Sequence, residues 1–225
     1  MALSDGDGRE SLERQRSSTG STYGRQGSPD SNDVESNARL TASTGAVLFV
    51  LLAAEGVTIL RIRGLLSAHV FIGMLLVPPV LLKMGSTTYR FFRYYTGAPA
   101  YRQKGPPLLL LRAIGPLVVV LTVVVLASGV ALVLTDSTWR SSLLFLHKAS
   151  FVLWFGAMTV HVLGHALETA TLAPRDWIRR TRTDVAGAGR RQWAVLVSLV
   201  VGVLAGLLLL AHVGPWLASS GNAGH

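Results

Sequence analysis

Apolar residues occur along the chain in five long blocks separated by polar connections. Each block approaches the roughly 20 residues that a helix needs to cross the hydrocarbon core of a bilayer. Two adjacent prolines, Pro78 and Pro79, predict a kink in the second block, because neither can donate to the helix ladder. The sequence predicts an all-α integral membrane protein whose transmembrane domain covers residues 41–217. The five expected helices are residues 42–61, 64–84, 108–135, 143–167 and 193–216.

The two ends of the chain have a different composition. Residues 1–40 are rich in Ser, Gly, Asp, Glu and Arg and contain few large apolar residues. Such a segment cannot bury enough apolar surface to offset the entropy lost on ordering. We therefore expect a disordered tail over residues 1–40, and a short polar tail over residues 218–225.

The chain has a formal net charge of +9, and its basic residues are distributed as in a membrane protein. The connection from Lys83 to Arg112 holds six basic residues and no acid, and the one from Glu168 to Arg191 holds six arginines against three acids. The positive-inside rule makes the side of these loops cytoplasmic. We expect a multi-pass plasma-membrane protein with the N-terminus in the cytoplasm and the C-terminus outside. Membrane lipid, rather than nucleic acid, is the expected surrounding partner.

The chain contains no cysteine. Disulfides, iron–sulfur clusters, thiolate ligation of haem iron and covalent haem attachment through a CxxCH motif are therefore excluded.

Three histidines fall near the predicted outer face. His69 lies five residues into the second span, His147 four residues into the fourth, and His212 about four residues from the outer end of the fifth. Ionisable residues inside spans are costly and indicate function. Two imidazoles at one depth on facing helices are what a six-coordinate b-type haem requires. We expect His69 and His147 to be the axial ligands, with His212 as an alternative ligand. Histidines near span ends can also bond to headgroups or to neighbouring helices.

A fourteen-residue spacing adds to this pattern. His161 follows His147 by fourteen residues, which puts the two on nearly one helical face about 21 Å apart. Gly115 and Gly129 repeat the interval in the preceding span, where glycine allows a flat ring to approach the backbone. Gly73, one turn after His69, is expected to serve in the same way. Glycine in a membrane helix is also common as a packing contact.

Arg61 and Arg63 depart from the positive-inside rule, because they lie in the short outer connection before His69. A guanidinium binds a carboxylate with two parallel hydrogen bonds, so these arginines are candidates to hold the propionates of an outer haem. Ordinary interfacial arginines would have the same position.

The inner end of the bundle lacks the second ligand that another haem would need. Fourteen residues after His69 the chain has Lys83, and neither it nor Met84 is a suitable replacement. His161, His165 and Glu168 share one helical face and would suit a divalent metal, quinone protonation or an interfacial polar cluster. We expect one haem b.

Glu55 lies in the first span near the depth of the outer histidines. Its carboxylate has three possible roles, of which an ion pair with Lys148 is the expected one. The others are to orient an imidazole through its second nitrogen, or to relay protons.

Two stretches resemble small bacterial membrane proteins of the cytochrome b type. These are LLSAHVFIGMLLVPPVLLKMGSTTYRFFRYYTG and LHKASFVLWFGAMTVHVLGHALE. That superfamily includes the haem-bearing membrane subunits of formate dehydrogenases and hydrogenases and the ferric-reductase-like domains. The resemblance covers about residues 42–170 and implies a four-helix haem-binding core. It implies that His69 and His147 bind the outer haem and that His161 matches one inner ligand, whereas Lys83 departs from the pattern.

The expected function is electron transfer across or within the plasma membrane by bound haem b. No dinucleotide-binding segment follows the spans, so electrons would come from a quinone or a redox partner protein. The chain would be an electron-transfer subunit rather than a self-contained catalyst. The alternative is a non-haem membrane protein, either a small proton- or metal-linked transporter or a structural subunit.

Overall fold

The computed structural model describes residues 29–97, 109–135, 138–178 and 185–214, and within these ranges the chain is helical without strands. Five helices are long and apolar enough to cross a membrane, which confirms the predicted fold class. The elements are α2 (Pro29–Leu60), α3 (Ile62–Tyr95), α5 (Leu109–Leu134), α6 (Arg140–Leu172), the 3₁₀ turn η1 (Ala173–Asp176) and α8 (Ala188–Leu210).

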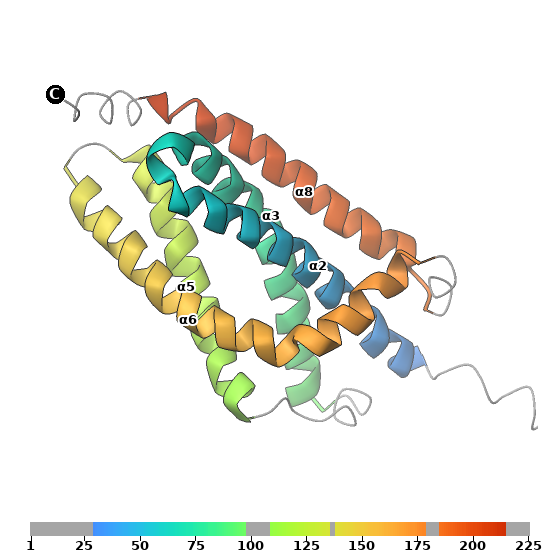
Figure 1. The fold of residues 1–225 in the computed structure, drawn as a ribbon. Helices are drawn as coiled ribbons and strands as arrows, with labels where there is room; N and C mark the ends of the chain where they lie inside the picture. The colour runs from blue at the N-terminus through green and yellow to red at the C-terminus, as the bar shows by residue number, and fades with distance from the viewer. Residues whose placement is uncertain (1–28, 98–108, 136–137, 179–184, 215–225) are drawn as a thin grey trace, which may run out of the picture.

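The helices form two groups (Figure 1). In one group, α3 packs between α2 and α8, and in the other α5 packs along α6. Fewer contacts join the groups, mainly between α2 and α6 and between α3 and α5. The structure therefore does not confirm the predicted four-helix core, because close packing is concentrated within each group.

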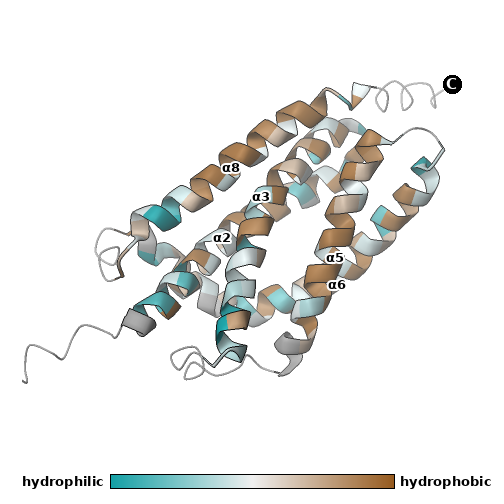
Figure 2. Ribbon diagram, turned by 180° about the vertical axis from the view of Figure 1, so that it is seen from behind, coloured by the Kyte–Doolittle hydropathy of each residue, from teal (hydrophilic) through white to brown (hydrophobic). Residues whose placement is uncertain are grey.

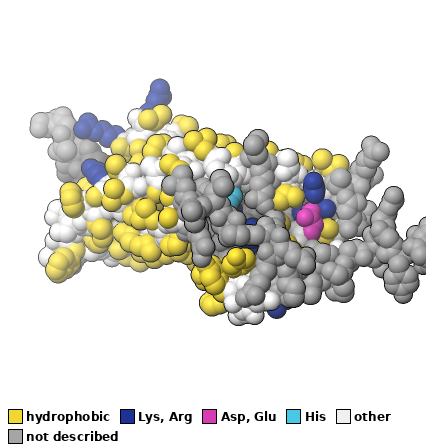
Figure 3. All heavy atoms as spheres, turned by 90° about the horizontal axis from the view of Figure 1, so that it is seen from below, with side chains coloured by type: hydrophobic (Ala, Val, Ile, Leu, Met, Phe, Trp, Pro, Cys, Tyr) yellow, Lys and Arg dark blue, Asp and Glu magenta, His cyan; other side chains and the backbone are white. Residues whose placement is uncertain are grey.

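The outer surface of the bundle suits a lipid environment. Large apolar side chains such as Phe145, Leu163 and Leu208 are more than two-thirds exposed, at 75%, 72% and 74%. Figure 2 shows apolar residues dominating the middle of α8 and α5, with polar residues more frequent toward the helix ends. In the space-filling view, apolar side chains cover much of the described surface (Figure 3). Exposure of this kind is expected where hydrocarbon rather than water surrounds the helices.

The first helix begins earlier than predicted. α2 starts at Pro29, so residues 29–40, which the sequence assigned to the N-terminal tail, belong to this helix. Charge pairs explain the difference, because the Glu35 carboxylate accepts from Arg39 Nε at 3.1 Å and from Arg175 Nη1 at 3.2 Å. Arg175 lies just after α6, so the polar start of α2 is held by another part of the fold. Residues 1–28 and 218–225 lie outside the described residues.

The turn between α2 and α3 is a single residue, Arg61. The break from helical geometry in α3 follows it at Leu65 (φ −120°, ψ 21°), whereas the backbone dihedrals remain helical through Pro78 and Pro79. The expected kink at Pro78 and Pro79 is therefore not accompanied by a break in the helical backbone dihedrals. Membrane helices tolerate internal proline where neighbouring groups satisfy the freed carbonyls. The break from helical geometry lies instead at Leu65, just after the chain reverses at Arg61.

Two glycines allow α8 to lie very close to α3. A Cβ added to Gly202 would stand 2.6 Å from the Leu75 carbonyl oxygen, and one on Gly206 would stand 2.7 Å from the Phe71 ring. The four-residue spacing puts both glycines on one face of α8. This is the small-residue contact through which membrane helices approach closely.

Replacing Gly202 by Leu should separate α8 from α3, because the added side chain would overlap the backbone of α3. We expect the free energy of unfolding to fall by about 1–3 kcal/mol, as for other overpacked contacts. The measurement is unfolding of the detergent-solubilised protein followed by circular dichroism. Gly156→Leu is the control, since nothing lies within 4 Å of a Cβ there. Equal effects of the two substitutions would contradict this account of the contact.

Candidate functional site

The imidazoles of His69 and His147 lie beside each other. His69 is on α3 and His147 on α6, and their ring centroids are 6.2 Å apart with an interplanar angle of 79°. The prediction that these two histidines share one depth is confirmed. Their helices are not close neighbours in the described structure, so the side chains meet across the boundary between the two helix groups.

His69 is held by two residues of α2. Its Nδ1 lies 2.9 Å from Glu55 Oε1 and 3.1 Å from Thr58 Oγ1. Thr58 is buried, and its hydroxyl donates to the Glu55 carbonyl at 2.6 Å. Glu55 therefore orients an imidazole, and its carboxylate contacts His69 rather than the exposed Lys148 that was expected. The one-residue turn at Arg61 brings α2 and α3 close enough for this contact.

His147 is held in a comparable way by α5. Its Nδ1 lies 3.1 Å from the Val125 carbonyl oxygen and 3.1 Å from Ser128 Oγ. Ser128 is buried, and its hydroxyl donates to the same Val125 carbonyl at 3.0 Å. The imidazole is thus tied to one turn of the neighbouring helix.

These contacts decide which nitrogen of each imidazole carries the hydrogen. A carbonyl oxygen only accepts, so His147 Nδ1 must be the donor to Val125. An ionised Glu55 likewise accepts from His69 Nδ1. In a neutral imidazole the other nitrogen, Nε2, then has the free lone pair. Neither Nε2 is hydrogen-bonded within the part of the chain that the structure describes. Both histidines are therefore prepared to act as metal ligands.

The predicted glycines differ in their surroundings. A Cβ on Gly129 would stand 3.1 Å from His147 Cε1, so this glycine admits the imidazole itself. A Cβ on Gly73 would make an ordinary contact of 3.5 Å with Glu55 Oε1. Nothing lies within 4 Å of a Cβ on Gly115.

The remaining outer candidates lie at the surface. Arg61, in the turn, and Arg63, in the first turn of α3, are both exposed at the end of the bundle nearest His69. His212 lies just past the end of α8, and its side chain is exposed. The structure brings together His69 and His147 and does not add His212 to the pair.

The inner candidates form a looser group. The rings of His161 and His165 are 4.9 Å apart, and His161 Nδ1 is buried without a hydrogen-bond partner among the described residues. Lys83 Nζ donates to the Thr41 carbonyl at 3.1 Å. The side chain of Glu168 lies outside the described residues. Among the side chains that the structure does describe, no group of three or more His, Cys, Asp or Glu is arranged to hold a metal ion.

Sequence reasoning did not identify Thr58, Val125 and Ser128 as part of this site. Two signals were present in the sequence. Thr58 follows Glu55 by three residues, which puts both on one helical face, and Ser128 directly precedes the predicted Gly129. The Val125 contact involves a backbone carbonyl, so no side-chain pattern reports it.

Comparisons with protein-family models, with curated proteins and with solved structures found no match to this chain. The case for a function therefore rests on the geometry of the two histidines and the residues that hold them.

Gly129→Ala should be less favourable than Gly115→Ala, although both changes gain a similar helix propensity of about 0.5–1 kcal/mol. The new methyl group at Gly129 meets an imidazole that Val125 and Ser128 hold in place. We expect Gly115→Ala to be the more stable variant by about 1 kcal/mol, a cost typical of mild overpacking. Thermal unfolding in detergent measures the difference. A Gly129→Ala protein as stable as Gly115→Ala would show that the imidazole is free to move.

Proposed function

We propose that this chain is a haem-b-binding electron-transfer protein of the plasma membrane, with His69 and His147 as the axial ligands. The observation that carries the proposal is the pair of adjacent imidazoles whose Nδ1 atoms are both engaged and whose Nε2 atoms are both available. It is an electron-transfer subunit rather than a self-contained catalyst.

The ring separation supports this assignment. Two imidazoles on opposite sides of one iron have centroids roughly 6 Å apart, since each nitrogen lies about 2 Å from the metal. The observed separation is 6.2 Å.

The chain's own residues would hold and adjust the bound group. Haem supplies a one-electron couple in the membrane. Glu55 and Thr58 orient one imidazole, and Val125 and Ser128 orient the other. Such partners raise the basicity of a ligating histidine and define its direction.

The proposed orientation follows from charge. Arg61 and Arg63 would bind the propionates at the outer face, with the N-terminus in the cytoplasm and the C-terminus outside. One haem is proposed, and the electron donor would be a quinone or a redox partner protein.

Removing either imidazole should abolish haem binding. We expect His69→Ala and His147→Ala to lose the reduced-minus-oxidised bands of a b-type cytochrome, because six-coordinate iron needs both ligands. The measurement is the difference spectrum of protein purified after haem-replete expression, with haem quantified by its pyridine adduct. His165→Ala is the control and should keep the bands, since its ring pairs with His161 at the inner site.

A colourless wild-type protein would overturn the proposal. It would favour the non-haem alternative, a proton- or metal-linked transporter or a structural subunit. The Glu55–His69 pair is the feature that a proton-linked transporter would use.

Glu55→Gln should retain haem but raise its reduction potential. The carboxylate makes the His69 imidazole more electron-donating and adds negative charge, and both effects favour the oxidised form. A tenfold change in the one-electron equilibrium corresponds to a rise of about 60 mV. Potentiometric titration measures the shift. Glu35→Gln removes the same charge from the other end of α2 and should leave the potential unchanged. A Glu55→Gln potential equal to that of wild type would show that Glu55 does not act through His69.

A further inference from the structure

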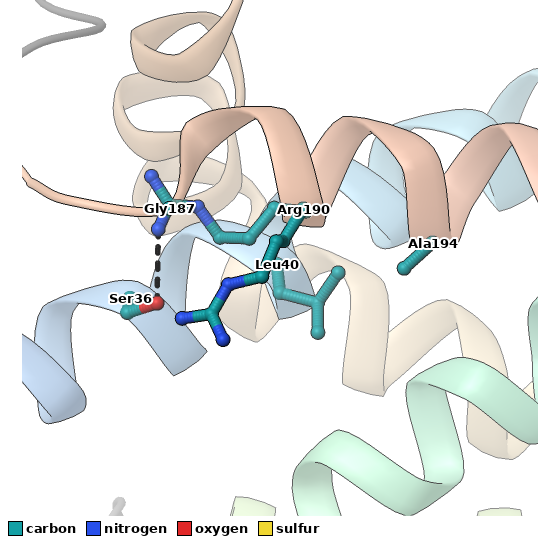
Figure 4. A pocket seen from close by; sticks show the side chains of 6 residues that line it. Ser36, Leu40, Gly187, Arg190 and Ala194 are labelled. Atoms are coloured by element: carbon teal, nitrogen blue, oxygen red, sulfur yellow. Dashed lines mark hydrogen bonds between the residues drawn. The ribbon is translucent and has the colours of Figure 1, made fainter.

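An open cavity of about 230 Å³ lies between the beginning of α2 and the beginning of α8 (Figure 4). The turn between α2 and α3 lies at the opposite end of the bundle (Figure 1). Its position makes it independent of the proposed haem site. The cavity is lined by Ser36 and Leu40 of α2 and by Gly187, Arg190, Arg191 and Ala194.

One wall of the cavity is strongly cationic. The first turn of α8 contains Arg190 and Arg191 and no acidic residue. Both guanidinium groups lie over Gly187, since a Cβ there would stand 3.3 Å from Arg190 Nη2 and 3.6 Å from Arg191 Nη1. Gly187 itself has a positive φ of 84° and directly precedes the first turn of α8. Two cationic side chains beside one residue are unfavourable unless an anion lies near them.

Arg191 is a fixed part of that wall. It is only 5% exposed, and its Nη1 donates to Ser36 Oγ at 2.9 Å (Figure 4). The same Nη1 donates to the Ala186 carbonyl at 2.8 Å. Arg190 is exposed, with no hydrogen bond or ion pair to any residue that the structure describes. One guanidinium is therefore held in place by the fold, and the other is available to a ligand.

The carboxylate closest to Ser36 along α2 does not neutralise this charge. Glu35 Oε1 already accepts from Arg39 and from Arg175. Two arginines thus share this acid, and a further two line the cavity. This excess of positive charge favours an anion with several acceptor oxygens. A phosphate group is such an anion, because two of its oxygens can accept from the paired N–H donors of a guanidinium.

The other lining residues point to a lipid as the source of the phosphate. Leu40 and Ala194 give the cavity an apolar side. The cavity lies at the end of the membrane-spanning helix Ala188–Leu210, where Trp193 is 67% exposed. Exposed tryptophan at a span end is typical of the headgroup region of a bilayer. A ligand here would meet cations at its head and apolar side chains beside its glycerol and upper acyl carbons.

We propose that this cavity binds the phosphate of an anionic phospholipid headgroup. Arg190 contacts the phosphate, Arg191 adds a fixed positive charge, and Leu40 and Ala194 contact the apolar part of the lipid. The positive-inside rule puts this site in the cytoplasmic leaflet, where basic clusters between membrane helices meet anionic headgroups.

The test is native mass spectrometry of the full chain, titrated in detergent with phosphatidylglycerol or with zwitterionic phosphatidylcholine. The wild-type protein should retain one phosphatidylglycerol in preference to phosphatidylcholine. Arg190→Gln should weaken that binding about fivefold, the effect of one basic residue at an anionic surface. Ala194→Leu keeps the charge but reduces the cavity, and it should weaken binding to a similar degree.

Arg90→Gln is the matched control, because it removes one cation from α3 at the same end of the bundle and should leave binding unchanged. Equal losses in Arg90→Gln and Arg190→Gln would overturn the proposal in favour of general surface attraction. A loss of phosphatidylglycerol binding in Arg190→Gln with no loss in Ala194→Leu would also overturn the proposal. Displacement of phosphatidylglycerol by millimolar inorganic phosphate would identify a free-phosphate site and overturn the lipid assignment.

Discussion

The hydrogen bond that Nδ1 of each half-buried imidazole donates is the constraint on which the candidate site depends. Inside a bilayer no water is available, so an unsatisfied N–H costs several kcal/mol. Each imidazole finds its acceptor on the helix that precedes its own in the chain. α2 supplies Glu55 to His69 on α3, and α5 supplies Val125 to His147 on α6. Each helical hairpin therefore positions its own histidine, and the two imidazoles come to lie beside each other where the hairpins meet.

The two acceptors are chemically different, and this makes the pair asymmetric. His69 bonds to a carboxylate, whereas His147 bonds to a backbone carbonyl and a hydroxyl. A carboxylate partner draws the Nδ1 hydrogen more strongly and makes the imidazole the better electron donor. The α2–α3 side of the pair thus contains an acidic side chain, whereas the α5–α6 side contributes a carbonyl and a hydroxyl. Any cation bound between the two rings would be stabilised chiefly from the α2–α3 side.

The sequence was sufficient for features that depend on position along a helix. Hydropathy located the five spans, and counting residues from their ends put His69 and His147 at one depth. It was insufficient for features that depend on how helices rotate about their axes. The partner of Glu55 is one such feature, because His69 and Lys148 lie at similar depth and only the rotation of α2 separates them. The helical start of α2 is another, since its polar residues are ordered by Arg175, which is distant in the sequence.

The contacts between α3 and α2 differ along the length of α3. Near His69, the imidazole contacts Glu55 and Thr58 of α2 through Nδ1, and its ring lies beside that of His147 on α6. Further along the helix, Lys83 donates to the Thr41 carbonyl, and Thr41 and Ser86 share a hydrogen bond of 2.9 Å. These polar contacts join α3 to α2 starting fourteen residues beyond His69. The α3 side chain at this position is Lys83 rather than an imidazole, so within the described residues the pairing of His69 with His147 is not repeated for His161.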